Sequence, residues 1–260
     1  LATTDSASVS NQWQELLSAQ EVSQDIVSTL NAKRTILSVG NARIEILEQI
    51  GDGPITKFLM SNPRGGLFSV GLSTPDLKKF RTSLDSQNIS YLAESEQIYI
   101  DQSFTSEGGL RIVVNAFEEN ESIGLLNRFF QVSYLVSNPK TISIELADKF
   151  CLNQASFDLA ESSEFGFTGF CAYINELCDD HIEVIHPLNQ TNAMGRFFSD
   201  RGPSLYMCFA ESSNMNEIRS RANDISPGGW IGVQEETIKP ESAFLHPKLL
   251  GGVMVGVKAK

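Results

Sequence analysis

The sequence predicts an α+β fold in which β-α-β-β modules follow one another in tandem and form two domains. The main observation is an internal repeat, because residues 42–84 and 180–222 both read as strand, irregular connection, strand and helix. The two copies lie about 138 residues apart, which is long for a solenoid period and suits a duplicated domain. The aligned residues include Glu45 with Glu183, Phe58 with Phe197, and Leu67 with Leu205.

A helix and a hairpin come first in the chain. Residues 8–19 follow helical periodicity. The apolar face of this helix holds Trp13, Leu16 and Leu17. Residues 34–40 and 42–48 then read as two strands, and Gly40-Asn41 between them predicts a hairpin turn.

The next module repeats the pattern. Its helix is expected at residues 74–87, with Thr74 as the N-cap and Pro75 at the first helical position. Its strands are expected at residues 66–73, 97–102 and 108–117.

The second half contains two further modules, which the polar stretch at 118–124 separates from the first half. Strands are expected at residues 128–137, 165–175, 181–188, 204–212, 243–247 and 251–259, and helices at 139–150 and 214–224. The predicted organisation is a first domain at 1–117, a linker at 118–126 and a second domain at 127–260.

The composition argues against several classes of partner. The chain has 260 residues with 20 basic and 32 acidic side chains, so the net charge is −12, and no Lys/Arg cluster offsets it. A phosphate backbone would be repelled, so we expect no nucleic-acid partner. No apolar run approaches the roughly 20 residues that span a bilayer, so we expect no membrane partner. The expected partner is a small-molecule ligand or substrate, bound by a monomer with paired domains or by a homodimer.

The four cysteines indicate the cellular compartment of the protein. Cys151, Cys171, Cys178 and Cys208 show no C-x-x-C spacing and lie near apolar stretches. We interpret them as small, reduced core residues, which is typical of a cytoplasmic protein. The chain begins without Met, and we expect its N-terminal strand, of which residues 1–5 are the tail, to be truncated.

Three strings carry a resemblance to a known superfamily. They are "IEVIHPL" at 182–188, "RFFSDRGPSLYMCF" at 196–209 and "AFLHPKLLGGVMVGV" at 243–257, with partial echoes in the first half. The chain thereby resembles the vicinal-oxygen-chelate superfamily of glyoxalase, bleomycin-resistance and ring-cleaving dioxygenase proteins. It is most similar to methylmalonyl-CoA epimerase and glyoxalase I-like proteins. The resemblance implies paired βαβββ modules that curl into two half-barrel domains, each around a cavity.

The resemblance also implies where a divalent metal would bind. In metal-dependent members four strands each provide one ligand, so that two adjacent substrate oxygens can complete the coordination of the ion. In the second copy these positions are Gln131, Glu183, Met207 and Gly256, and in the first copy Glu45, Ser69 and Val113, with one position before Leu1. Only Gln131 and Glu183 remain as weak metal candidates in the second copy. We therefore expect no cofactor, and a divalent metal only with an incomplete ligand set.

The histidines suggest a ligand site instead. His181 and Glu183 are two residues apart on a predicted strand and share a face, whereas His186 points the other way. We expect His186 and His246 to be loop-edge residues that pack and form hydrogen bonds. The predicted ligand-binding residues are Gln131, His181, Tyr206, Met207 and Ser69.

Three functions remain open. The first is an isomerase, epimerase or lyase acting on a small thioester or α-hydroxycarbonyl substrate, with Glu183 or Glu45 as the catalytic base. The second is a metal-free protein of the resistance type that binds a small molecule in an apolar half-barrel. The third, a two-domain extradiol dioxygenase, needs a His, His, Glu set for iron that neither copy contains.

Overall fold

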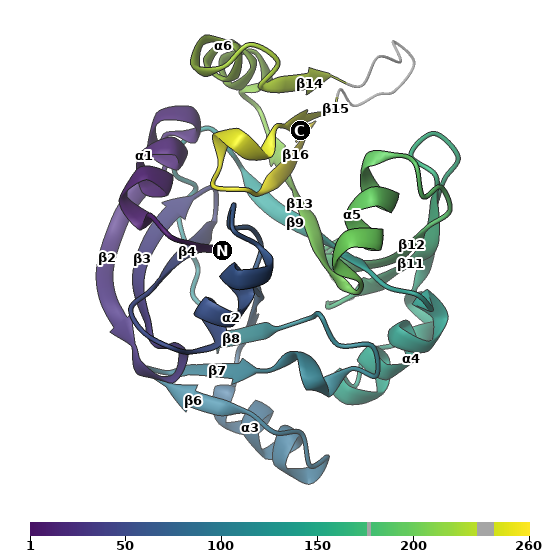
Figure 1. Ribbon diagram of the computed structural model, residues 1–260. Helices are drawn as coiled ribbons and strands as arrows, with labels where there is room; N and C mark the ends of the chain where they lie inside the picture. Colours follow the sequence, from purple (N-terminus) through teal and green to yellow (C-terminus); the bar gives the residue numbers. More distant parts are fainter. Residues whose placement is uncertain (176–177, 233–241) are drawn as a thin grey trace. The chain divides into compact units, whose positions relative to one another are not determined.

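The computed structural model describes residues 1–175, 178–232 and 242–260, shown in Figure 1. Contacts divide the chain into two compact units. Unit 1 comprises residues 1–68, 119–130 and 207–260, and unit 2 comprises 69–118 and 131–206. Each unit combines residues from both halves of the repeat, so contacts group the chain differently from the sequential domains at 1–117 and 127–260. Those domain boundaries stay a prediction.

Unit 1 begins with a four-stranded sheet of order β1-β4-β3-β2, in which β1 runs parallel to β4. The elements are β1 (Ala2–Thr3), α1 (Ser6–Leu17), β2 (Gln20–Val27), β3 (Ala32–Val39), β4 (Ala42–Gln49) and α2 (Pro54–Ser61). The predicted helix and hairpin are confirmed. Trp13, Leu16 and Leu17 are at most 1% exposed, and Gly40 adopts a positive φ of 58° between β3 and β4.

The remainder of unit 1 contains strands in the order β13-β16-β15-β14. These elements are β13 (Ser204–Ser212), α6 (Met215–Ile225), β14 (Trp230–Gly232), β15 (Ser242–Leu245) and β16 (Met254–Ala259). The first three residues of β13 fall in unit 2. Helix α6 lies against α1, where Arg221 donates hydrogen bonds to the Glu15 carbonyl and the Ser18 hydroxyl.

Unit 2 contains a second four-stranded sheet, of order β5-β8-β7-β6. Its elements are β5 (Val70–Thr74), α3 (Leu77–Ser86), β6 (Leu92–Glu94), β7 (Gln97–Ile100) and β8 (Ile112–Ala116). The predicted cap of α3 at Thr74 is wrong. The N-cap is Asp76, whose carboxylate accepts a hydrogen bond from the Lys79 N–H, while Thr74 ends β5. A carboxylate two residues later caps the helix and leaves Thr74 free to extend the strand.

The other sheet segment of unit 2 has the order β10-β11-β12-β9. Its elements are β9 (Arg128–Leu135), α4 (Pro139–Phe150), β10 (Asp158–Ser162), β11 (Phe167–Tyr173), β12 (His181–Pro187) and α5 (Ala193–Arg201). Helix α4 packs on β11 and β12. Its first turn is capped by Asn138, whose side chain accepts a hydrogen bond from the Thr141 N–H, and Pro139 occupies the first helical position.

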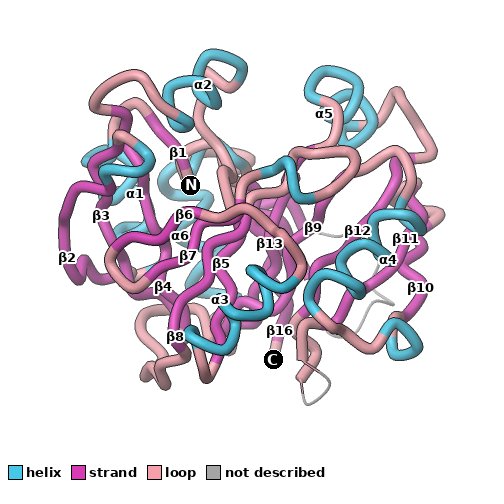
Figure 2. The backbone as a smooth tube through the Cα atoms, turned by 90° about the horizontal axis from the view of Figure 1, so that it is seen from below, coloured by secondary structure: helices cyan, strands magenta, loops and turns pink. Residues whose placement is uncertain are grey.

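The predicted repeat is confirmed in the order of elements. Strand, helix, strand and helix follow one another as β4, α2, β5 and α3, and again as β12, α5, β13 and α6. Figure 2 draws these helices in cyan and these strands in magenta. Short 3-10 turns lie at Ser28–Leu30, Gln102–Phe104, Gln154–Ser156 and Pro247–Leu249.

The cysteine prediction needs a correction. All four cysteines are free thiols, as expected, but only Cys208 is buried. Cys151 is exposed and is the C-cap of α4, in a left-handed conformation with φ of 54°. None of the described helices is both long and apolar enough to cross a membrane. The cytoplasmic location stays a prediction.

Candidate functional site

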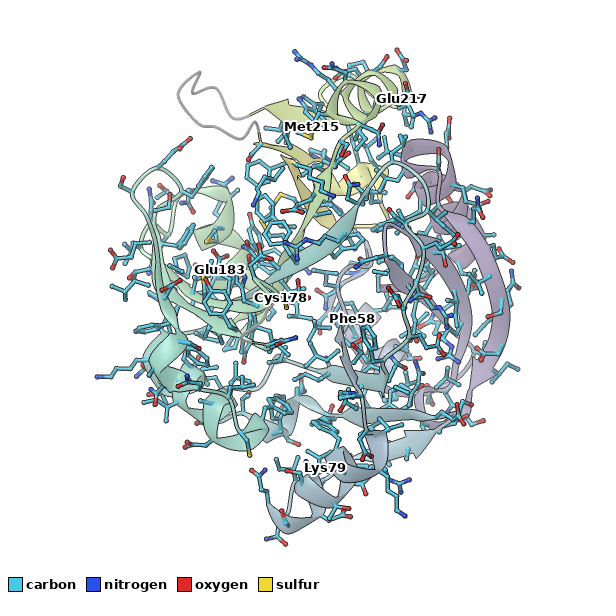
Figure 3. The ribbon with its side chains drawn as sticks, turned by 180° about the vertical axis from the view of Figure 1, so that it is seen from behind. Phe58, Lys79, Cys178, Glu183, Met215 and Glu217 are labelled. Carbon is cyan, nitrogen blue, oxygen red and sulfur yellow. The ribbon has the colours of Figure 1, made fainter. Side chains whose placement is uncertain are left out.

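Glu183 lies in unit 2 on β12, between β11 and β9 (Figure 3). Its direct neighbours are Cys171 on β11 and Ser133 on β9, and the neighbour of His181 on β9 is Gln131. Directly paired residues on adjacent strands present their side chains to the same face of a sheet. The strand register therefore brings Gln131, Ser133 and Glu183 together.

A hydrogen-bond chain connects these three side chains. The Gln131 amide Nε2 donates to the Ser133 Oγ at 3.3 Å, and the Ser133 hydroxyl donates to the Glu183 Oε2 at 2.6 Å. Ser133 is 1% exposed. The distance of 2.6 Å is typical of a hydroxyl bound to a charged carboxylate. One oxygen of Glu183 is therefore held in place by a buried, uncharged partner.

Burial raises the pKa of Glu183 above its ordinary value. The Ser133 hydrogen bond, the charge of His181 and a hydrogen bond from Gln131 act in the opposite direction. A carboxylate whose pKa is raised toward neutral pH can both accept and return a proton. The adjacent Cys171 thiol differs, because burial, with smaller effects from Glu183 and Asp158, raises its pKa to about 12. Cys171 therefore remains a protonated thiol beside Glu183.

His181 is oriented by its surroundings. Its Nδ1 lies 2.7 Å from the Asp179 carbonyl oxygen, so Nδ1 carries the hydrogen. Its ring lies 5.4 Å from the ring of Tyr173, and the Tyr173 hydroxyl donates to the Asp158 carboxylate at 2.9 Å. These contacts fix the plane of the imidazole on the strand that carries Glu183.

Two aromatic side chains, which we call the aromatic wall, pack against the strand that carries Glu183: Phe197 from α5 and Tyr206 from β13. The rings of Phe197 and Tyr206 meet edge to face at 5.0 Å. Both pack against a buried cluster that includes Ile185 and Met194, as does Cys171. Ile185 is two residues beyond Glu183 on β12, so the wall and the carboxylate share a sheet face. Burial raises the pKa of Tyr206, which keeps its hydroxyl protonated and able to donate.

The predicted site residues thus separate into groups. Gln131, His181, Glu183 and Tyr206 belong to unit 2, whereas Met207 and Glu45 belong to unit 1. Ser69 is also in unit 2 and lies directly before β5 of the other sheet.

Glu45 in unit 1 has a charged partner. Arg34 Nη1 lies 3.2 Å from Glu45 Oε1, and Arg34 Nε donates to Asp25 Oδ1 at 2.8 Å. Arg34 is 4% exposed. A buried guanidinium needs such partners, so Glu45 serves as part of an ion-pair network.

The residues at the metal positions that the resemblance implies do not fit a metal site. Met207 is buried and offers only a thioether. A Cβ at Gly256 would lie 2.2 Å from the ring of Phe209, so this ring occupies the place of the ligand expected there. The Phe209 ring also packs against the rings of Phe130 and Phe244, with distances between ring centroids of 6.1 and 5.7 Å. In residues 1–175, 178–232 and 242–260, no three His, Cys, Asp or Glu side chains form a group that could hold an ion.

Of the other two histidines, His246 lies at a loop edge as expected, whereas His186 lies within β12, paired with Thr168 of β11. His186 Nδ1 lies 2.8 Å from the Val136 carbonyl oxygen, and its ring meets Phe198 edge to face at 5.5 Å. His246 Nδ1 accepts a hydrogen bond from the Lys248 N–H. Both arrangements agree with the predicted packing and hydrogen-bonding roles.

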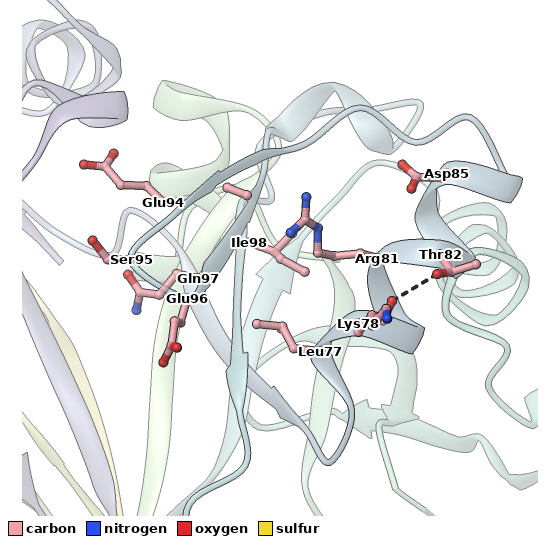
Figure 4. Close-up of a pocket in the computed structure, with 11 residues that line it drawn as sticks. Leu77, Lys78, Arg81, Thr82, Asp85, Glu94, Ser95, Glu96, Gln97 and Ile98 are labelled. Atoms are coloured by element: carbon pink, nitrogen blue, oxygen red, sulfur yellow. Dashed lines mark hydrogen bonds between the residues drawn. The ribbon is translucent and has the colours of Figure 1, made fainter.

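A separate hollow of about 740 Å³ lies in unit 2 between α3 and the β6–β7 hairpin (Figure 4). Leu77 and Ile98 form its apolar part, and Lys78, Arg81 and Glu94 lie among its polar residues. None of the predicted site residues lines this hollow. It is a surface feature of the first repeat copy, and the Glu183 site does not depend on it.

Sequence reasoning missed Ser133 and Cys171. Ser133 is two residues after Gln131 on the same strand, so period-two alternation could have placed it on the same face. Cys171 could be found only from the register of β11 with β12, which the sequence does not specify.

Comparison with known proteins addresses the fold. No protein-family model matches the chain, and no curated protein matches it. A solved structure of a 4-hydroxymandelate synthase variant from Streptomyces coelicolor matches with a TM-score of 0.69 and 11% identity, over 99% of this chain and 90% of that one. The chain has the vicinal-oxygen-chelate fold. At this identity the match establishes the fold alone, and it confirms the predicted tandem module architecture over nearly the whole of this chain.

Shorter matches also exist. Methylmalonyl-CoA epimerase from Mycobacterium tuberculosis matches 52% of this chain and 89% of its own, with 18% identity and a TM-score of 0.41. A Streptomyces coelicolor methylmalonyl-CoA epimerase bound to 2-nitronate-propionyl-CoA matches 52% of this chain and 98% of its own, with 17% identity and a TM-score of 0.42.

Proposed function

We propose that the protein is an isomerase, epimerase or lyase in which Glu183 moves a proton at the carbon next to a carbonyl group. The substrate class is a small thioester or α-hydroxycarbonyl compound. The observation that carries this proposal is the anchoring of Glu183 Oε2 by the Ser133 hydroxyl at 2.6 Å. A general base must be held in one orientation to accept a proton from carbon.

The proposed chemistry uses groups of unit 2 only. Glu183 takes the α-proton, and the electrons of the broken C–H bond move onto the carbonyl oxygen as an enolate. The Tyr206 hydroxyl, which burial keeps protonated, is the donor on a neighbouring strand that can stabilise this oxygen. Glu183 then returns the proton to carbon. No step is assigned to a metal, because the residues at the family positions do not form a ligand set.

Exchange of α-protons with solvent tests the proposal without knowledge of the exact substrate. Propionyl-CoA, dihydroxyacetone and the hemithioacetal of methylglyoxal would each be incubated with the protein in D₂O and followed by NMR. We expect exchange of at least one compound, and Glu183→Gln should slow it by roughly 10²–10⁴-fold, the usual contribution of a general base.

Glu45→Gln is the matched control, because it makes the same change at the equivalent position of the other repeat copy. It should leave the exchange rate within about twofold of wild type, since Glu45 is engaged with Arg34. Equal losses in the two variants would contradict the assignment to Glu183. Absence of exchange with every compound would contradict proton transfer.

A second candidate is a metal-free protein that binds a small molecule without chemistry. The Phe197–Tyr206 pair favours it, because aromatic side chains beside a few polar groups are typical of ligand pockets. Under this alternative a compound of the same panel raises the melting temperature without exchanging its protons. Binding would then persist in Glu183→Gln and weaken in Tyr206→Ala.

A further inference from the structure

A chain of neutral polar side chains crosses the second sheet of unit 2, away from Glu183. The Tyr99 hydroxyl donates to Gln97 Oε1 at 2.5 Å, and Gln97 Nε2 donates to Asn115 Oδ1 at 2.7 Å. Tyr99 and Gln97 are 7% and 8% exposed. Buried polar side chains are costly unless each is satisfied, so this chain holds its members in fixed orientations.

The direction of these hydrogen bonds determines whether the free end of the Asn115 amide is a donor or an acceptor. Because Asn115 Oδ1 accepts the hydrogen from Gln97, its amide nitrogen faces elsewhere with two N–H donors. Within the described residues, this nitrogen donates to no other group. Asn115 is only partly buried, and its partner on β5 is the exposed Ser73. This series of hydrogen bonds therefore ends in the two oriented N–H donors of Asn115, beside the Ser73 hydroxyl.

The sheet face that carries Asn115 has room for a ligand. Helix α3 packs near β8 on the opposite face, where Ile98, Ile112 and Val114 are buried. On the Asn115 face, Gly71 pairs with Val113, and a Cβ added at Gly71 would meet no atom within 4 Å. Gly71 is two residues from Ser73 on β5, so the open space and the Asn115 donors lie on one face.

We propose that this face binds a small, uncharged molecule through its carbonyl oxygen, which accepts hydrogen bonds from the Asn115 amide over the open space at Gly71. The three residues of the chain are uncharged, and Arg111 at the start of β8 is already paired with Asp101 at 3.3 Å. A carboxylate would lose hydration here without gaining a free cation, so a neutral carbonyl is favoured. This site does not depend on the chemistry assigned to Glu183.

The side-chain NH₂ signals of Asn115 in a ¹⁵N-correlated NMR spectrum of the full chain provide a direct test. They would be assigned as the signals lost in Asn115→Asp, which preserves the shape and removes the donors. Acetamide is the neutral probe and acetate the charged one, at concentrations of up to about 50 mM because fragments of this size bind weakly. We expect acetamide to shift the Asn115 NH₂ and Gly71 N–H signals, and acetate to shift them at least about tenfold less.

Two variants separate binding from folding. Gly71→Val fills the open space with a residue suited to a strand, so it should leave the melting temperature unchanged and reduce the acetamide-induced shifts at least about tenfold. Lys79→Ala, on the exposed surface of α3, should change neither quantity. Failure of acetamide to shift either signal, or equal shifts in Gly71→Val, would overturn the proposal. A stronger response to acetate would overturn the assignment to a neutral ligand.

Discussion

Glu45 and Glu183 occupy the same position in the two copies of the repeat, yet their surroundings differ in charge. Glu45 pairs with the buried Arg34, whereas Glu183 is held by the uncharged Ser133. A carboxylate matched by a guanidinium is a structural group, because moving its proton would break the pair. Glu183 has a neutral hydrogen-bond partner, and burial raises its pKa more than the charge of His181 lowers it. Repetition of a residue in a duplicated fold therefore does not repeat the charge of its surroundings.

The difference in charge around Glu45 and Glu183 depends largely on one residue of the adjacent antiparallel strand. Arg34 on β3 stands opposite Leu47, two residues beyond Glu45. The matching position on β11 is Gly169, which stands opposite Ile185, two residues beyond Glu183. A Cβ at Gly169 would lie 2.0 Å from the Val184 carbonyl oxygen, so no side chain fits there. The close approach of β11 to β12 thus excludes a cation from the place that Arg34 takes in the first copy.

The largest expected effect comes from placing a side chain at Gly169. Gly169→Ala should lower the free energy of unfolding by about 3 kcal/mol, since the added methyl overlaps main-chain atoms that cannot move independently. Urea unfolding followed by circular dichroism measures this change. Gly71→Ala, also on a strand of unit 2, is the matched control and should leave the stability unchanged or raise it by less than about 1 kcal/mol, because nothing lies near its Cβ. Similar losses in both variants would show that β11 can move away from β12.

Removal of Arg34 should have the next largest effect. Arg34→Met retains the length of the side chain but leaves Glu45 and Asp25 without their cation. We expect a loss of roughly 2 kcal/mol, below the values for fully buried pairs because the Asp25 side chain is 41% exposed. Unfolding in urea at low and at high salt provides the measurement, and the loss should be smaller at high salt. Adding Glu45→Gln to Arg34→Met should recover part of the stability. If it recovers none, the two side chains are not coupled.

Loss of the Ser133 hydroxyl should be milder. Ser133→Ala removes one hydrogen bond from Glu183, and we expect a loss of about 1 kcal/mol in the free energy of unfolding. The same variant should reduce α-proton exchange by roughly tenfold, because Glu183 Oε2 is no longer held. Ser133→Thr, which keeps the hydroxyl, is the conservative control for the exchange rate. An unchanged rate in Ser133→Ala would mean that Ser133 contributes to packing alone.

The sequence predicted the fold well because the fold depends on periodic patterns. Alternating strands, the apolar face around Trp13 and the Gly40-Asn41 turn are local signals, and the structure confirms them. The α3 cap was misplaced because Thr74 and Asp76 are both good capping residues, and which of them caps depends on where β5 ends.

The site was harder to predict, because the properties of Glu183 depend on residues distant in the sequence. Ser133 is 50 positions away from Glu183, and only the parallel register of β9 with β12 brings them together. The absence of a charge at Gly169 likewise follows from the close contact of two backbones. The repeat identified Glu45 and Glu183 as equivalent, and the sequence alone could not show that their partners differ in charge.

The smallest expected effect is a pH dependence of stability at Glu183. Its folded-state pKa is raised above the ordinary value of 4.5, mainly by burial. Below the unfolded pKa the carboxyl group is protonated in both states, and its contribution to stability is fully present. As the pH rises through the folded pKa, the unfolded chain has already released this proton, so the contribution is lost. Stability of the wild type should therefore fall relative to Glu183→Gln from about pH 4.5 upward and level off above the raised pKa.

Urea unfolding of both proteins at a series of pH values measures this difference, in which the other titrating groups largely cancel. Ser133→Ala sharpens the comparison because the Ser133 hydrogen bond lowers the pKa of Glu183. Removing it should raise that pKa further and widen the pH range over which stability falls. In the Glu183→Gln background the same substitution should add no pH dependence, since no proton is exchanged there. A difference that stays constant with pH would show that Glu183 has enough access to water to titrate normally, and the contrast with Glu45 would then rest on geometry alone.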